Sequence, residues 1–309
     1  MSERETHPPR RITPVGGCAV PPDDPLRFPL DESELDTFVR AALTEDGAFD
    51  DITTIATVPT DRHEHGTIVA RHAGVVAGVP LAIAAFRLLD PHATIRIDAD
   101  DGVRVSAGMP ILRVSAHARA ILSAERVALN FLQRLSGIAT LTGRYVDAVR
   151  GTRARILDTR KTTPGLRALE KYAVRAGGGR NHRFGLSDAV LIKDNHIAAV
   201  DGDVRLAIER AREFVEPGTV IEVECDSAEQ VRLALDADAD IILLDNMRPP
   251  QLAECVAIVH GRAWTEASGG ITLETVRAVA ETGVDRISVG ALTHSAIALD
   301  IGLDFQASG

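Results

Sequence analysis

The stretch that decides the fold is Ile241-Ile242-Leu243-Leu244-Asp245-Asn246, an apolar run that ends in two polar side chains. Short β-prone runs of this kind alternate with helical segments through the second half of the chain. The runs are 156–157, 190–192, 220–223, 241–244, 263–267 and 287–289, and the helical segments are 166–176, 204–214, 228–235, 251–259 and 273–282. Six such units in succession predict an α/β barrel of parallel strands. A doubly wound open sheet is the alternative, weakened because no G-x-G-x-x-G turn follows the first run.

The first half of the chain has a mixed pattern. Apolar side chains recur at helical spacing over residues 32–43, and residues 67–70 and 94–97 are short β-prone runs. Residues 118–135 predict a long amphipathic helix that continues toward Val149. The first residues are rich in Pro, Arg and Gly, which is typical of a loosely held tail. We therefore expect a flexible tail over 1–28, an N-terminal α/β sandwich domain over 29–135, the barrel over 136–295 and a C-terminal segment over 296–309.

Composition excludes several classes of protein. No apolar run approaches the roughly 20 residues that a membrane span needs. The three cysteines form no CxxC pair, so a disulfide framework is not expected and a reducing cytoplasm fits best. The formal net charge of −10 argues against nonspecific binding to nucleic acid.

Positive charge is concentrated in one part of this acidic chain. Residues 153–193 contain ten arginines and lysines against three acids, and they include all three lysines of the protein. An ammonium group acts as a compact point charge on a phosphate or carboxylate, a role that arginine fills less well. The cluster therefore indicates an anion site, with a solvated basic face as the alternative.

Polar residues or glycines follow every β-prone run of the second half. In α/β barrels, the active site forms at the carboxyl ends of the strands. The sequence thus predicts that these residues meet at one mouth of the barrel. They lie at 158–161, 193–196, 224, 245–246, 268–270 and 288–291.

Two glycine turns follow the last two strands, at Ser268-Gly269-Gly270 and at Ser288-Val289-Gly290-Ala291. Glycine lets backbone N–H groups approach a ligand closely, and a helix that begins after such a turn favours an anion. The pair of turns predicts a phosphate site, with plain loop geometry as the alternative.

Acidic residues mark the middle strands. Glu222 and Glu224 are two apart on one strand, so both face the lumen of the barrel. Glu224 and Asp245 would lie near Mg²⁺ that arrives with a pyrophosphate, or would stabilise a developing sugar cation. An internal ion-pair network with Lys161 and Lys193 is the alternative, and the two interpretations are compatible.

Cations complete the candidate site. A ligand that needs many cations, a phosphate loop and two acids is itself polyanionic and contains a diphosphate. The residues alone therefore predict an α/β-barrel enzyme that acts on a phosphorylated sugar and an organic acid. The cations are Arg126, Arg160, Lys161, His182, Arg183 and Lys193.

Long, ordered motifs carry a resemblance to a known family. They are 125–130 (ERVALN), 158–167 (DTRKTTPGLR), 177–183 (GGGRNHR), 191–196 (LIKDNH), 222–225 (EVEC), 243–246 (LLDN), 266–272 (EASGGIT) and 288–290 (SVG). From about Leu35 to Leu303 the chain resembles the quinolinate phosphoribosyltransferases.

The resemblance implies a fold and an activity. The fold is a mixed α/β N-terminal domain followed by an open α/β barrel of parallel strands. The activity transfers the 5-phosphoribosyl group of phosphoribosyl pyrophosphate to quinolinate, and it gives nicotinate mononucleotide, pyrophosphate and CO2 in de novo NAD biosynthesis. The implied cofactor is Mg²⁺, with no direct protein ligand assigned. The implied assembly is a cytoplasmic homodimer in which Arg126 of one subunit reaches the site of the other.

The resemblance also implies roles for residues. Lys161, Glu224 and Asp245 would be catalytic, and Glu222 is a less certain member. The quinolinate site would contain Arg126, Thr159, Arg160, His182, Arg183 and Lys193. The phosphoribosyl pyrophosphate site would contain Lys161, Glu224, Asp245, Ser268, Gly269, Gly270, Gly290 and Ala291.

Three rival functions stay open at the level of sequence. A nicotinate-type phosphoribosyltransferase would bind one carboxylate instead of two, and the number of cations favours the dicarboxylate. A related protein of molybdenum transport shares part of the pattern, but the complete 159–162 and 182–183 stretches favour the quinolinate enzyme. A non-catalytic anion sensor of the same fold would bind phosphoribosyl pyrophosphate without turnover.

Overall fold

The computed structural model describes residues 25–306, and the chain forms two compact units. One unit, here called the sandwich unit, contains residues 25–143, 162–179 and 291–306 of the described chain. The other, here called the barrel unit, contains residues 144–161 and 180–290 of the described chain. Residues 1–24 of the predicted tail lie outside the described residues.

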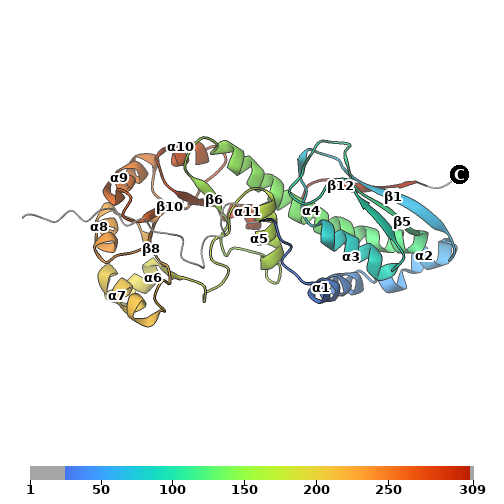
Figure 1. The fold of residues 1–309 in the computed structure, drawn as a ribbon, viewed down its shortest axis with the longest axis horizontal. Coiled ribbons are helices and arrows are strands. Elements are labelled where there is room, and N and C mark those ends of the chain that lie inside the picture. The colour runs from blue at the N-terminus through green and yellow to red at the C-terminus, as the bar shows by residue number, and fades with distance from the viewer. Residues whose placement is uncertain (1–24, 307–309) are drawn as a thin grey trace, which may run out of the picture. The chain divides into compact units, whose positions relative to one another are not determined.

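A four-stranded antiparallel sheet forms the centre of the sandwich unit, with the strand order β12-β1-β5-β3 (Figure 1). The four strands are β1 (His63–Ala70), β3 (Thr94–Ile97), β5 (Pro110–His117) and β12 (Ile301–Gln306), and a separate pair is β2 (Gly74–Val75) with β4 (Arg104–Val105). The helices of the unit are α1 (Glu32–Glu45), α2 (Ile52–Thr57), α3 (Val79–Leu89), α5 (Arg167–Ala176), α11 (Ala291–His294) and most of α4 (Ala118–Ala148).

Alternation and helical periodicity build the core of this unit. Strand β5 alternates buried and exposed positions along much of its length, as expected of a sheet with one face packed on helices. Ile68 and Phe86 are almost completely buried, and burial of each such side chain contributes about 1.5–3 kcal/mol relative to exposure. Helix α1 begins with a capping box in which Asp31 accepts from the backbone N–H of Glu34.

A six-stranded parallel sheet forms the barrel unit, with the strand order β6-β11-β10-β9-β8-β7. The first strand in sequence therefore pairs with the last, which curls the sheet into a barrel and excludes the doubly wound alternative. Among the described residues, β6 and β7 share no ladder, so the barrel is open between them. The strands are β6 (Arg155–Leu157), β7 (Val190–Ile192), β8 (Ile221–Cys225), β9 (Ile241–Asp245), β10 (Trp264–Ser268) and β11 (Arg286–Ser288).

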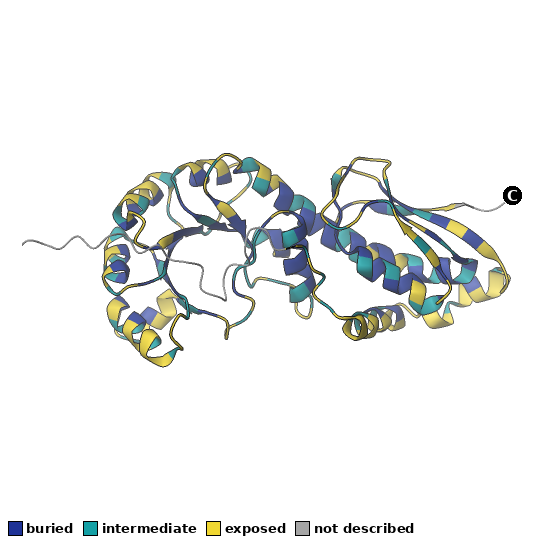
Figure 2. Cartoon of the chain, viewed as in Figure 1, coloured by how far each residue is buried: buried dark blue, intermediate teal, exposed yellow. Residues whose placement is uncertain are grey.

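Helices surround the curved sheet on its outer side (Figure 1). They are α6 (Asp194–Ala198), α7 (Val204–Phe214), α8 (Ala228–Asp236), α9 (Pro249–Val259) and α10 (Val276–Glu281). The strands between them are mostly buried, as Figure 2 shows. On β8, Val223 and Cys225 are fully buried and alternate with Glu222 and Glu224, which leaves the acids on the opposite face.

The predicted open barrel is confirmed, and the structure divides the chain differently from the predicted domains. The boundary predicted between residues 135 and 136 falls inside the continuous helix α4. By their contacts, residues 162–179, which include the predicted barrel helix α5, belong to the sandwich unit. The C-terminal segment also belongs there, because β12 pairs with β1 along its whole length. Strand pairing between segments more than 200 residues apart leaves no local trace in sequence periodicity.

Candidate active site

Charged side chains from neighbouring strands meet at the carboxyl ends of the barrel. Lys193 directly follows β7, and its Nζ lies 2.5 Å from Oε2 of Glu224 on β8. Asp245 ends β9 and accepts a hydrogen bond of 2.5 Å from the side-chain amide of Asn246. The internal ion pair that the sequence predicted as an alternative is therefore present between Lys193 and Glu224.

Several charged neighbours act on the carboxyl group of Asp245. Partial burial raises the pKa of its carboxyl group, and the charge of Glu224 raises this pKa further. Asn246 and the two ammonium groups of Lys193 and Lys161 act in the opposite direction. Two carboxylates and two lysines thus interact at this mouth, which suits a ligand that brings both anionic groups and a divalent cation.

The first glycine turn has a geometry that other residues would not tolerate. Gly269 has φ +93°, and a Cβ built there would lie 2.1 Å from Oδ1 of Asn246. Gly270 has φ +60° with open space around a Cβ. The turn is tied to the neighbouring strand end, because the backbone N–H of Asn246 donates to the carbonyl of Ser268 at 2.9 Å. The backbone of this turn is therefore held close beside Asp245.

Only the first of the two glycine turns differs from the sequence prediction that a helix begins directly after it. Helix α10 begins only at Val276, so Gly269 and Gly270 do not lead directly into a helix. A short turn intervenes, in which the N–H of Thr272 donates to Oγ1 of Thr275. Gly290 lies two residues after the end of β11, and Ala291 is the first residue of α11, so the second turn does lead directly into a helix.

A buried aspartate anchors the segment that carries His182. Asp158, fully buried after β6, accepts hydrogen bonds from the side-chain amide of Asn181 at 2.5 Å and from the backbone N–H of His182 at 2.8 Å. Arg180 forms a parallel bridge with Leu157 beside it. These contacts hold residues 180–182 along the open edge of the barrel.

The other predicted anion contacts occupy different environments. Arg183 is buried, and its Nη1 donates to the carbonyl of Ala189 at 2.9 Å. The hydroxyl of Thr159 accepts from the backbone N–H of Lys161 at 3.0 Å, and Arg160 lies half-buried between them in sequence. Arg126 is exposed on helix α4, in the sandwich unit.

Glu222 does not join Glu224. Its carboxylate is 2% exposed, and Oε2 lies 3.0 Å from Nε2 of His182, deeper in the barrel. Glu266, fully buried on β10, lies 3.5 Å from the same nitrogen. The lumen therefore holds a second acidic group below the mouth.

Sequence reasoning missed Asp158 and Glu266 as site residues, although both lie inside quoted motifs. A signal for Glu266 was present, because an acid in the middle of a β-prone run is expensive to bury without a reason. Asp158 had a weaker signal, as the first polar residue after an apolar run.

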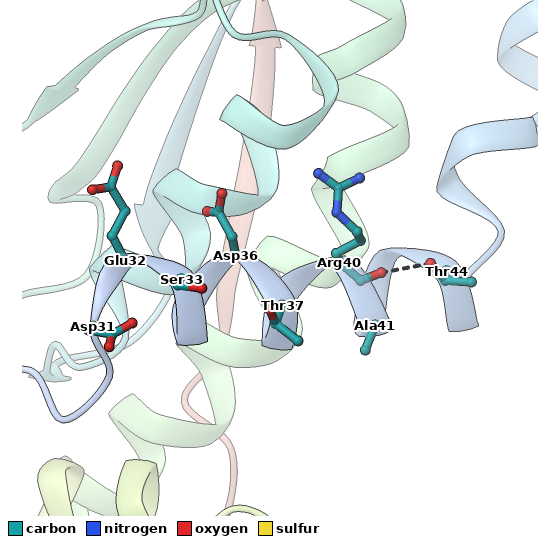
Figure 3. A pocket seen from close by; sticks show the side chains of 8 residues that line it. All are labelled: Asp31, Glu32, Ser33, Asp36, Thr37, Arg40, Ala41 and Thr44. Atoms are coloured by element: carbon teal, nitrogen blue, oxygen red, sulfur yellow. Dashed lines mark hydrogen bonds between the residues drawn. The ribbon is translucent and has the colours of Figure 1, made fainter.

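A broad hollow of about 1080 Å³ lies along helix α1 (Figure 3). Its described lining comes from that one helix, with Glu32, Asp36 and Arg40 as the charged side chains on the upper side in Figure 3. None of the predicted site residues lines it. The chemistry indicated by the sequence lies at the strand ends of the barrel unit instead.

Comparisons with known families and proteins find relatives along most of the chain. A family model described as "Quinolinate phosphoribosyl transferase, C-terminal domain" matches residues 138–304, and the corresponding N-terminal model matches residues 51–136. A carboxylating nicotinate-nucleotide pyrophosphorylase of Mycobacterium leprae is 50% identical over 272 residues, which are 86% of this chain and 95% of that protein. A chloroplastic protein of the same name from Arabidopsis thaliana is 44% identical and covers 87% of this chain and 82% of its own length.

Solved structures show the same relationship. The nicotinate-nucleotide pyrophosphorylase of Francisella tularensis is 37% identical with a TM-score of 0.84, and the match covers 91% of this chain and 99% of that one. The human nicotinic acid phosphoribosyltransferase is 12% identical with a TM-score of 0.55, over 87% of this chain and 73% of that one. The second likeness is one of fold alone.

Proposed function

We propose, because the chain belongs to the quinolinate phosphoribosyltransferase family, that it joins quinolinate to the ribosyl group of phosphoribosyl pyrophosphate and releases CO2 and pyrophosphate. The product is nicotinate mononucleotide, a step of de novo NAD biosynthesis. The observation that carries the proposal is the meeting of two carboxylates, two lysines and a tight glycine turn at one mouth of the barrel. This set of groups suits a diphosphate beside an organic acid.

Quinolinate is assigned to the cationic side of the mouth. Thr159, Arg160, His182, Arg183 and Lys193 come from the strand ends and the segment at the open edge of the barrel. Arginine forks bind carboxylates in a bidentate way, and the buried Arg183 loses little freedom on binding. Arg126 would complete the pocket from a second subunit, which makes a homodimer part of the proposal.

Phosphoribosyl pyrophosphate is assigned to the region of Lys161, Glu224, Asp245 and the turns at 268–270 and 290–291. The close carboxylates of Glu224 and Asp245 fit a divalent cation, since such an ion would relieve their mutual repulsion. Bound Mg²⁺ would neutralise the leaving pyrophosphate, and we assign no direct protein ligand to it.

The chemistry needs positioning and charge rather than a covalent nucleophile. The ring nitrogen of quinolinate attacks C1 of the ribose as the bond to pyrophosphate breaks, and the sugar passes through a cationic state. Glu224 and Asp245 stabilise that charge, and Lys161 assists the departure of pyrophosphate. The quaternised ring then loses its 2-carboxylate as CO2, because the adjacent positive nitrogen stabilises the electron pair left on carbon. A proton from solvent completes the product.

The cytoplasm is the proposed location, supported by the bacterial relatives, whereas several plant relatives are named for organelles. Within residues 25–306, no helix is long and apolar enough to cross a membrane.

The test is an assay of nucleotide formation and CO2 release with quinolinate, phosphoribosyl pyrophosphate and Mg²⁺, with nicotinate in parallel. We expect turnover with quinolinate and one CO2 for each nucleotide. Turnover with nicotinate alone would overturn the dicarboxylate pocket. Binding of phosphoribosyl pyrophosphate without turnover of either acid would instead establish a sensor.

A further inference from the structure

Three side chains form a buried cluster inside the barrel, below the charged groups of the mouth. They are Glu222 on β8, Glu266 on β10 and His182 on the segment at the open edge, and they are here called the lumen triad. Nε2 of His182 lies 3.0 Å from Glu222 and 3.5 Å from Glu266. Within residues 25–306, this is the one group of three such side chains close enough to hold a metal ion.

The protonation of His182 decides between a metal site and a hydrogen-bonded cluster. Its Nδ1 accepts a hydrogen bond of 2.8 Å from the backbone N–H of Arg183, so Nδ1 carries no proton. The ring proton of the neutral imidazole is therefore on Nε2, where it donates to Oε2 of Glu222. A metal-binding histidine has the opposite arrangement, with a free Nε2 lone pair and a proton on Nδ1. The geometry of the lumen triad therefore favours a hydrogen-bonded cluster over a metal site.

Glu266 is the most deeply buried acid of the triad, and its surroundings disfavour its charged form. It is fully buried, and neither carboxylate oxygen has a hydrogen bond of good geometry with a described residue. Burial raises the pKa of Glu266 to about 7, and the charge of Glu222 adds to the rise. A positive charge on His182 would lower the pKa of Glu266, but Nδ1 of His182 already accepts a hydrogen bond and so carries no second ring proton. Arg286 and Ser288 on β11 also lower this pKa.

From this geometry, we propose that Glu266 is a positioning residue for the dicarboxylate pocket and acts as a neutral acid in the working enzyme. With Glu266 protonated, Glu222 alone carries charge in the triad and holds His182 through Nε2. His182 in turn fixes the backbone of Arg183, which donates to Nδ1. Glu266 itself touches no substrate in this arrangement.

The charge state of Glu266 then affects substrate binding. Its ionisation places a second negative charge against Glu222, behind the residues assigned to the two carboxylates of quinolinate. Two like charges in a poorly solvated site repel each other and weaken binding of a dianion. Quinolinate binding should therefore weaken as pH rises through the pKa of Glu266. The identity of the dianion rests on the proposed function, whereas the protonation of Glu266 does not.

The experiment compares Glu266→Gln with wild type and with Glu64→Gln as a matched control. Glutamine keeps the shape of the neutral acid and removes its titration. Glu64 is also a buried glutamate, on β1 of the sandwich unit, and its variant should behave like wild type. The KM for quinolinate is measured at saturating phosphoribosyl pyrophosphate, together with kcat and with the infrared absorption of protonated carboxyl groups.

For wild type and Glu64→Gln, the KM for quinolinate should rise about threefold to tenfold between about pH 6 and pH 8.5. For Glu266→Gln, it should stay within about twofold across that range, with kcat within about twofold of wild type at the acid end. The infrared spectrum of wild type should show a carboxylic-acid band that disappears as pH rises through neutrality. The same band should be absent from Glu266→Gln at every pH.

An identical rise of KM in Glu266→Gln and wild type would overturn the proposal. The absence of this band from the infrared difference spectrum between wild type and Glu266→Gln would overturn it as well. A stoichiometric metal that Glu266→Gln loses would also overturn it. If Glu266→Gln does not fold, Glu222→Gln provides the test, because removal of the neighbouring charge should move the rise of KM to lower pH. Absence of quinolinate turnover in wild type would refute the proposed function, and the infrared band would still decide the state of Glu266.

Discussion

Replacement of Gly269 with alanine should destabilise the barrel unit by about 3 kcal/mol, whereas Gly270→Ala should cost only about 1–2 kcal/mol. Both glycines have positive φ, at +93° and +60°. The two variants therefore share the strain of a left-handed backbone, and only one of them adds a steric clash. They form a matched pair within one turn.

The magnitude for Gly269→Ala has two parts. The left-handed conformation costs a non-glycine residue about 1–2 kcal/mol. The new Cβ would lie 2.1 Å from Oδ1 of Asn246 and 2.9 Å from its backbone nitrogen. The side chain of Asn246 must then move and lose its hydrogen bond to Asp245, worth about 1 kcal/mol, and the backbone must shift as well. At Gly270, no atom lies within 4 Å of the new Cβ, so only the strain remains.

Urea unfolding followed by tryptophan fluorescence measures this difference. The chain has one tryptophan, Trp264, on the strand that leads to the turn, so its emission reports on the barrel unit. We expect a clearly lower midpoint for Gly269→Ala than for Gly270→Ala, with similar slopes. Equal midpoints for the two variants would refute the steric argument and the tight approach of this turn to Asn246.

Three other predictions concern the charged residues. Arg160→Ala and Lys161→Ala should each reduce kcat/KM for the proposed reaction by about 2–4 kcal/mol of transition-state stabilisation, and near-normal kinetics in a folded variant would contradict their assigned roles. Mixed Arg126→Ala and Lys193→Ala proteins, each inactive alone, should regain part of the activity in steady-state assays through heterodimers, and no recovery despite subunit exchange would exclude the role of Arg126 across subunits. The pKa of Glu266 is raised from 4.5 to about 7 in the folded protein, so its contribution to stability should be lost as pH rises between these values. Between about pH 4.5 and pH 7, the free energy of unfolding of wild type should fall by about 3 kcal/mol relative to that of Glu266→Gln. Urea titrations at several pH values measure both free energies, and an equal dependence on pH in the two proteins would contradict this.

The sequence determined the local elements of the barrel unit closely. Strand β7 and helix α7 have the bounds that periodicity predicted, because a strand or helix that buries one face shows its period in the chain itself. Alternation also placed Glu222 and Glu224 on one face of β8, opposite the fully buried Cys225. The order of the polar strand ends also indicates one mouth with a phosphate-binding turn.

Tertiary structure decided what local patterns do not encode. The pairing of β12 with β1 joins a strand near the C-terminus to a strand of the first half of the chain, and so makes the C-terminal segment part of the sandwich unit. Glu222 and Glu224 share a face, yet one pairs with His182 and the other with Lys193. Alternation fixes only the side of the sheet on which a residue lies. The stagger of the strands around the barrel selects its neighbours, and for this reason the lumen triad emerged only from the fold.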